Sequence, residues 1–140
     1  MGVALTQTSC IGVKMDKKLK LLIIDDNEEM LAALYNFFIK KNYDVVATPN
    51  SLHALKLIEA EKKGFDLVIT DLVMPNISGV GVISILKKKH PDTPVIAITG
   101  WGEHPEALAA EAKADLVLEK PFRLPALDKL INDLLSSKKH

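Results

Sequence analysis

The 140-residue chain is poor in several residue types, and each shortage excludes a class of protein. Its single cysteine, Cys10, excludes a disulfide framework and a cysteine-based zinc site. Arg123 is the only arginine, and 18 basic side chains balance 18 acidic ones, so nucleic acid is not an expected direct partner. The apolar runs fall far short of the roughly 20 residues that a membrane span needs, so we expect no membrane partner.

What the chain does have is aliphatic material for one folded domain. Hydrophobic residues make up 48% of the sequence although aromatic residues make up only 5%, and the length indicates a single domain. Residues 1–18 differ from the rest, because an uncharged stretch precedes a group of lysines, the reverse of a secretory signal. We interpret 1–18 as a tail, either engineered or created by start-site choice upstream of Met15; a functional N-terminal arm is the alternative. We expect the domain at 19–136 and a short C-terminal tail at 137–140.

Five short aliphatic runs alternate with amphipathic stretches. The runs are not interrupted by polar residues, which is typical of strands buried on both faces of a parallel sheet. Apolar side chains in the intervening stretches recur at helical spacing. The predicted strands are Leu19–Ile24, Tyr43–Ala47, Asp66–Thr70, Pro94–Ile98 and Asp115–Leu118. Strands alternating with helices over about 120 residues favour an α/β fold with one doubly wound parallel sheet.

Several residues mark the ends of the predicted helices. Asn50 and Ser78 stand where N-caps are expected, and Pro125 suits the first position of the last helix. Gly64 suits the residue just past the end of the second helix.

A glycine pair, Gly79 and Gly81, follows the third predicted strand. A nucleotide-binding loop would need a third glycine and a glycine-rich turn after the first strand, and the sequence has neither. Gly79 therefore suits a tight turn into a helix, and Gly81 suits close packing.

Charged and hydroxyl side chains gather where the strands end. The carboxyl ends of parallel strands meet at one edge of a sheet, so these groups are expected to lie together. They are Asp25 and Asp26 after the first strand, Asp71 after the third, Thr99 after the fourth and Lys120 after the fifth. Three neighbouring carboxylates raise one another's pKa values, and a hard cation such as Mg²⁺ offsets this cost. The pattern predicts a site for a phosphoryl group held between Mg²⁺, an amine and a hydroxyl.

Each of these residues alone has an ordinary explanation. Asp25 or Asn27 could simply cap a helix, Thr99 could be a strand former, and Lys120 before proline could lie in a solvated turn. Their occurrence at successive strand ends is what favours the functional interpretation.

With these motifs, the chain resembles the receiver domain of two-component response regulators from Lys20 to about Leu135. The matching segments are Ile23–Asn27, Asp66–Pro75, Ile96–Gly100 and Leu118–Phe122. The resemblance implies a flavodoxin-like fold of five βα units with a five-stranded parallel sheet in the order 2-1-3-4-5. It also implies a cytoplasmic protein of bacterial or archaeal origin.

The resemblance assigns roles to the acidic residues. Asp71 resembles the phosphoacceptor, whose carboxylate takes a phosphoryl group from a phosphohistidine. Asp26 resembles the direct ligand of Mg²⁺ or Mn²⁺, and Asp25 the carboxylate that holds the metal through water. Asp71 itself and the backbone carbonyl of Val73 would complete the metal site.

The resemblance also implies a switch. Thr99 is similar to the hydroxyl that moves toward the phosphoryl group, and Lys120 to the amine that pairs first with Asp71 and then with a phosphoryl oxygen. The Lys120–Pro121 bond is typically cis in this family. A histidine kinase or phosphotransfer protein would be the donor, and a downstream protein would bind the face from the fourth strand to the fifth helix.

The chain departs from the family pattern at three positions. Val117 occupies the place of the usual switch aromatic, for which Trp101 is a candidate substitute. Val73 and Trp101 flank the expected acyl phosphate, and neither side chain can orient an attacking water by hydrogen bonding. We therefore predict slow self-dephosphorylation.

Two alternatives come from other functional classes. A phosphohydrolase with an aspartyl nucleophile usually has a second Asp two residues after the first, and here that residue is Val73. A flavin-binding electron carrier would need a phosphate-binding loop after the first strand, where Asp25 and Asp26 would repel the phosphate. We expect a signalling module that is not an enzyme beyond its own phosphorylation and dephosphorylation, and that has no output domain. It would be either a free-standing regulator or a receiver from a larger protein such as a hybrid kinase.

Overall fold

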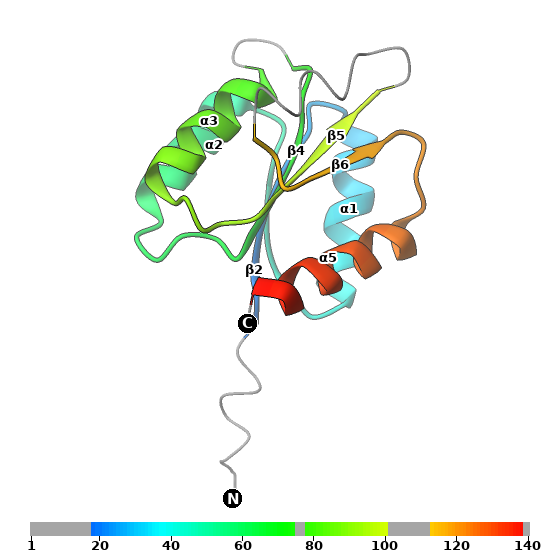
Figure 1. Cartoon of the computed structure of the whole chain (residues 1–140). Coiled ribbons are helices and arrows are strands. Elements are labelled where there is room, and N and C mark those ends of the chain that lie inside the picture. Colours follow the sequence, from blue (N-terminus) through cyan, green and yellow to red (C-terminus); the bar gives the residue numbers. More distant parts are fainter. Residues whose placement is uncertain (1–17, 75–77, 101–112, 139–140) are drawn as a thin grey trace, which may run out of the picture.

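The computed structural model describes residues 18–74, 78–100 and 113–138. These residues form one sheet with helices packed on both of its faces (Figure 1). The five strands are parallel, in the spatial order β3-β2-β4-β5-β6, which is the order 2-1-3-4-5 along the chain. The strands are β2 (Lys20–Ile24), β3 (Asp44–Thr48), β4 (Leu67–Asp71), β5 (Val95–Thr99) and β6 (Leu116–Glu119). The helices are α1 (Glu28–Lys40), α2 (Ser51–Ala60), α3 (Gly79–Lys89) and α5 (Leu124–Lys138). The predicted fold class is confirmed; the helix expected between β5 and β6 falls at 101–112, outside the described residues.

The two faces of the sheet carry separate apolar cores. Successive side chains of a strand point to opposite faces. Leu22 and Ile24 of β2 therefore pack with α2 and α3, whereas Leu21 and Ile23 pack with α1 and α5. Figure 1 shows these two helical layers on either side of the sheet. Because β2, β4 and β5 are buried on both faces, their aliphatic sequences are continuous rather than alternating.

The strands end later than the aliphatic runs that predicted them. Four of the five are displaced by one residue toward the C-terminus. Backbone pairing continues through polar residues, since the ladder joins Ile24 to Thr48 and Thr99 to Glu119. Pro94 stands before β5 because it has no N–H to donate. Asp71 and Thr99 are thus the last residues of their strands rather than the first of the following loops.

The helix caps are partly as predicted. Asn50 and Ser78 are N-caps, each accepting a backbone N–H with its side chain. The prediction for Gly64 is wrong, because α2 ends at Ala60 and a further turn follows, in which the Gly64 amide donates to the Glu61 carbonyl. Gly64 adopts a φ of +78° in that turn. Pro125 is the second residue of α5 rather than the first.

Candidate functional site

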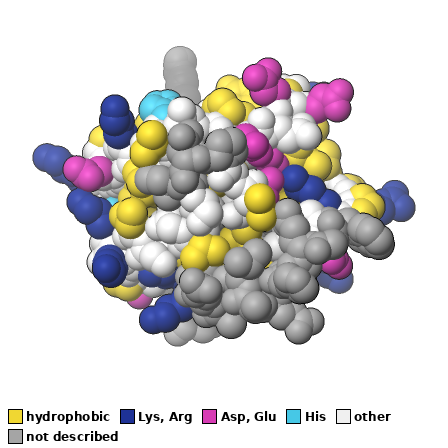
Figure 2. Space-filling model, turned by 90° about the horizontal axis from the view of Figure 1, so that it is seen from above, with side chains coloured by type: hydrophobic (Ala, Val, Ile, Leu, Met, Phe, Trp, Pro, Cys, Tyr) yellow, Lys and Arg dark blue, Asp and Glu magenta, His cyan; other side chains and the backbone are white. Residues whose placement is uncertain are grey.

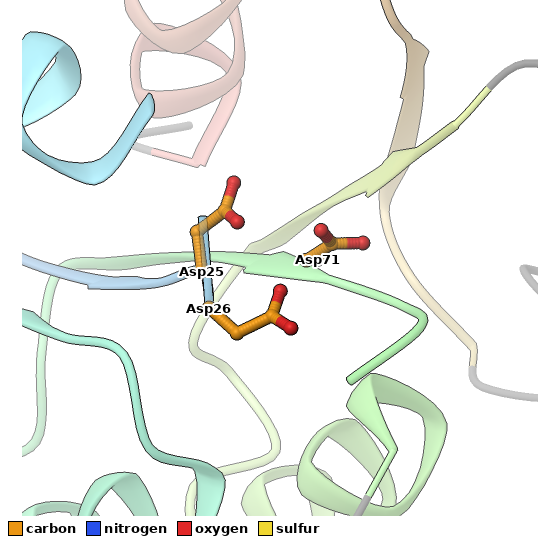
Figure 3. A group of neighbouring side chains, drawn as sticks. All are labelled: Asp25, Asp26 and Asp71. Atoms are coloured by element: carbon orange, nitrogen blue, oxygen red, sulfur yellow. The ribbon is translucent and has the colours of Figure 1, made fainter. Parts of the chain in front are cut away.

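Three carboxylates meet at the carboxyl ends of β2 and β4 (Figure 3). Asp25 and Asp26 directly follow β2, and Asp71 is the last residue of β4. One oxygen from each lies within 4.8 Å of the other two. Asp25 and Asp71 are buried, with 1% and 6% of their surface exposed, while Asp26 is exposed. The sequence-predicted acidic cluster is therefore present in the structure.

Asp25 is held by backbone hydrogen bonds. Its amide donates to the carbonyl of Thr48, and its Oδ1 accepts the amide of Asn27 at 2.9 Å. Asn27, not Asp25, is the N-cap of α1, and its side chain accepts the amide of Met30. The capping explanation thus applies to Asn27 and leaves the other oxygen of Asp25 for the site.

Lys120 joins the acidic cluster from the end of β6. Its Nζ lies 3.1 Å from Oδ2 of Asp71, to which it donates a hydrogen bond, and 3.7 Å from Oδ2 of Asp25. The Lys120 amide donates to the carbonyl of Thr99, which ties the end of β6 to the end of β5. The Lys120–Pro121 peptide bond is cis. Acidic and basic side chains adjoin on the face seen in Figure 2.

Burial and charge shift the pKa values of Asp25 and Lys120. Burial raises the pKa of Asp25, and the charge of Asp71 adds to the increase, against the opposing hydrogen bond from Asn27. Burial lowers the pKa of Lys120, but its hydrogen bond to Asp71 and the charges of Asp25 and Asp71 outweigh this, so the net pKa is raised. The ammonium form of Lys120 is consequently secured beside Asp71.

Two buried polar atoms of the described residues have no hydrogen-bond partner, and both lie at this edge of the sheet: Oδ2 of Asp25 and Oγ1 of Thr99. A buried polar group without a partner is costly, so each of these atoms is available to a ligand. Asp25 Oδ2 belongs to the carboxylate cluster, and three carboxylates against one ammonium leave an excess of negative charge. A divalent cation with oxygen ligands fits this donor set.

The other residues that the sequence analysis singled out are Val73, Val117 and Trp101. The Val73 side chain is 51% exposed, and its amide donates to Oδ1 of Asp71 at 3.2 Å. Val117 lies on β6 with 39% of its surface exposed. Trp101 lies outside the described residues. The sequence analysis missed one contact: Gly79, for which it expected only a tight turn into a helix, packs against the backbone of Asp71. The available signal was a glycine leading the apolar stripe of α3.

The family assignment rests on the match between residues 21–132 and the model of the response regulator receiver domain. The chain belongs to the receiver-domain family. Receiver domains bind Mg²⁺ at an acidic pocket, and they work with histidine kinases and downstream output domains in two-component systems. Within the described residues, no helix of this receiver domain has the length and apolar character needed to cross a membrane.

Curated relatives include longer regulators. The chain is 32% identical over 117 residues to the response regulator SaeR of Staphylococcus epidermidis, covering 83% of this chain and 50% of SaeR. It is 33% identical over 120 residues to the transcriptional regulatory protein GlrR of Escherichia coli, covering 85% of this chain and 27% of GlrR. The chain thus spans half or less of these two relatives.

Two solved structures match this chain over nearly their whole length. A receiver domain from Clostridium thermocellum is 30% identical with a TM-score of 0.79, covering 86% of this chain and 97% of that one. The response regulator TrrA from Thermotoga maritima, solved in complex with Mg²⁺ and BeF, is 28% identical with a TM-score of 0.74, covering 83% of this chain and 98% of that one.

Proposed function

We propose that Asp71 accepts a phosphoryl group from a phosphohistidine on a histidine kinase or phosphotransfer protein. The observation that carries this proposal is the contact of Asp71 Oδ2 with the Lys120 ammonium at 3.1 Å, within a cluster of three carboxylates. An ordinary surface Asp would need neither a partly buried ammonium nor two further acids. Membership of the receiver family supports the assignment.

The transfer exchanges one bond to phosphorus for another. A carboxylate oxygen of Asp71 forms the new P–O bond as the P–N bond to the donor histidine breaks, and the imidazole leaves with the electron pair and then takes up a proton. The Val73 amide holds Oδ1 of Asp71, and Lys120 lies at Oδ2, so both oxygens are fixed before the donor arrives. Such positioning is the main contribution a protein makes to phosphoryl transfer.

Asp26, Asp25 and the backbone carbonyl of Val73 would hold Mg²⁺ or Mn²⁺ beside Asp71. The bound cation would neutralise charge on the carboxylates and on the phosphoryl oxygens. The exposed Asp26 suits a direct ligand, and Asp25, buried and anchored by Asn27, suits a carboxylate that acts through water.

Phosphorylation would add about 1.5–2 negative charges at Asp71. The Thr99 hydroxyl is buried and has no hydrogen-bond partner among the described residues, so it can donate to a phosphoryl oxygen, while Lys120 can exchange the carboxylate for the phosphoryl group. Both residues lie at the ends of β5 and β6, so the change would be transmitted to a downstream target along the β5 to α5 face. We propose no other catalytic activity, because the position two residues beyond Asp71 is occupied by Val73, which cannot act as a general acid.

The direct test is chemical phosphorylation. The protein is incubated with acetyl phosphate or phosphoramidate in the presence of Mg²⁺, and intact mass spectrometry is used to count added phosphates. We expect one phosphate on the wild type and on the exposed-site control Asp133→Asn, and none on Asp71→Asn. An unmodified wild type, or an equally modified Asp71→Asn variant, would refute the proposal.

A further inference from the structure

The first residue of α3, Gly79, lies directly against the backbone at the end of β4. A Cβ atom on Gly79 would stand 2.0 Å from the carbonyl oxygen of Asp71 and 2.7 Å from Cα of Leu72. The Gly79 amide donates to the Leu72 carbonyl at 2.9 Å. The crowded atoms belong to the backbone of Asp71 and Leu72, which is fixed to β5 because Asp71 pairs with Ile98 and the Leu72 amide donates to the Ile98 carbonyl. They cannot turn aside as a flexible side chain could.

Backbone conformation does not account for a glycine at this position. Among the described glycines, only Gly64 has a positive φ, the region that other residues avoid. In a helix, glycine is less favourable than alanine by about 1 kcal/mol. The reason for a glycine at 79 is therefore steric: the absent side chain allows α3 to approach Asp71.

Gly79 lies on the buried face of α3, so the close approach of α3 to Asp71 is part of the packing of this helix. Gly79, Val82, Ile83 and Leu86 are all buried and recur at helical spacing, so they form one face of α3. The last three pack in the core beneath the sheet. Gly79 continues that face to the end of β4, where the next atoms are those of Asp71.

We propose that Gly79 is a positioning residue for phosphoryl transfer, because it sets the place of the Asp71 carboxylate and of the Val73 backbone. This inference rests on the proposed function. The Asp71 backbone carries the nucleophile, and the Val73 amide binds Oδ1 of Asp71 while its carbonyl is the proposed metal ligand. A methyl group at 79 would separate α3 from Asp71 by about 1 Å, and misplacement of that size can cost a reaction about 100-fold.

The experiment compares Gly79→Ala with Gly81→Ala. The two positions are two residues apart on one helix and so point to opposite sides, and Gly81 lies off the buried face. For each variant, circular dichroism gives the folded fraction. The rate of phosphorylation by acetyl phosphate at saturating Mg²⁺ is then divided by that fraction, and the Kd for Mg²⁺ is measured by calorimetry.

We expect Gly79→Ala to lose about 10- to 100-fold in rate per folded molecule, or in Mg²⁺ affinity, as outer-shell substitutions at metal sites do. Gly81→Ala should stay within about twofold of the wild type in both quantities, since it only improves helix propensity. A purely structural role for Gly79 would lower the folded fraction and leave the rate and Kd of the folded molecules unchanged. That outcome would overturn the proposal.

Two further arms keep the test decisive. If Gly79→Ala is unfolded, the double variant with Gly81→Ala is measured in trimethylamine N-oxide, which favours the folded state. If the wild type itself takes up no phosphate, the proposed function fails. The comparison of Mg²⁺ Kd values then still decides whether Gly79 positions the acidic site: a weakened Kd supports that role, and an unchanged Kd refutes it.

Discussion

Replacing Asp25 with asparagine should stabilise the metal-free domain while damaging its function. Asp25 is buried among like charges, and one of its oxygens has no hydrogen-bond partner in the described part of the protein. Asparagine keeps an oxygen for the Asn27 amide and removes the charge. Such a gain in stability would indicate that the wild-type site favours binding of a cation and a phosphoryl group at the expense of folding stability.

The magnitude follows from the distances. At an effective dielectric constant of 20, unit charges separated by the 4.8 Å limit of the acidic cluster repel by about 3.5 kcal/mol. The Lys120 ammonium at 3.7 Å offsets this with an attraction of about 4.5 kcal/mol on the same scale. These two contributions nearly cancel, which leaves the repulsion from Asp26 and the cost of a buried carboxylate oxygen that has no hydrogen-bond partner among the described residues, about 1–3 kcal/mol. We expect a gain of about 2 kcal/mol, or about 8 °C in Tm for a domain of this size.

The pH dependence has a definite sign. Because burial raises the pKa of Asp25, its contribution to stability is fully present below the unfolded pKa of about 3.9 and is lost as the pH rises through the folded pKa. At neutral pH the wild type therefore carries the unfavourable ionised form. Asp25→Asn should lack this dependence.

The assay is thermal and urea unfolding in EDTA and in Mg²⁺. Wild type should gain about 1.4 kcal/mol when Mg²⁺ is present at ten times its Kd, and Asp25→Asn should gain less. The exposed control Asp133→Asn should change stability by less than about 0.5 kcal/mol. If Asp25→Asn is no more stable in EDTA than Asp133→Asn, the electrostatic reasoning is wrong.

Three further predictions concern the same fold. Lys120→Met should abolish most phosphorylation by acetyl phosphate, and retention of the wild-type rate would argue against a role for Lys120. It should also lower the free energy of unfolding by about 1–2 kcal/mol, which is less than for a fully buried ion pair because the lysine side chain is 25% exposed. Val73→Asn should shorten the lifetime of the phosphorylated protein by roughly tenfold, since an amide can orient an attacking water where valine cannot; equal lifetimes in a dephosphorylation time course would contradict this. Burial, and then the charge of Asp128, raise the pKa of Tyr43, so urea unfolding should show stability falling more steeply above about pH 10 in the wild type than in Tyr43→Phe; equal slopes would contradict this.

The sequence predicted the residues of the site better than it predicted the ends of the strands and helices. Asp25, Asp26, Asp71 and Lys120 were expected together because the carboxyl ends of parallel strands share one edge, and the structure places them there. The strand order came from family resemblance, because hydrophobic periodicity shows that a strand is buried but not which strand lies beside it.

The errors have local causes. Aliphatic runs report burial, whereas strands end where backbone pairing ends, so Asp71 and Thr99 were placed just after the third and fourth predicted strands although they close β4 and β5. Gly64 was assigned to a helix end because glycine marks a left-handed residue without specifying which turn contains it. The contact of Gly79 depends on how closely α3 approaches β4, a distance that a glycine at the start of an apolar stripe permits but does not specify.

The placement of Asp71 connects the end of β6 with helix α3. Its side chain accepts a hydrogen bond from Lys120, which follows β6, while its backbone is in contact with Gly79, the first residue of α3. A change in charge at Asp71 therefore acts first on the β5 and β6 ends, whereas a displacement of its backbone acts on α3. Hydrogen exchange could separate the two effects: a purely electrostatic response would leave the amides of α3 unchanged, and a mechanical one would alter their protection.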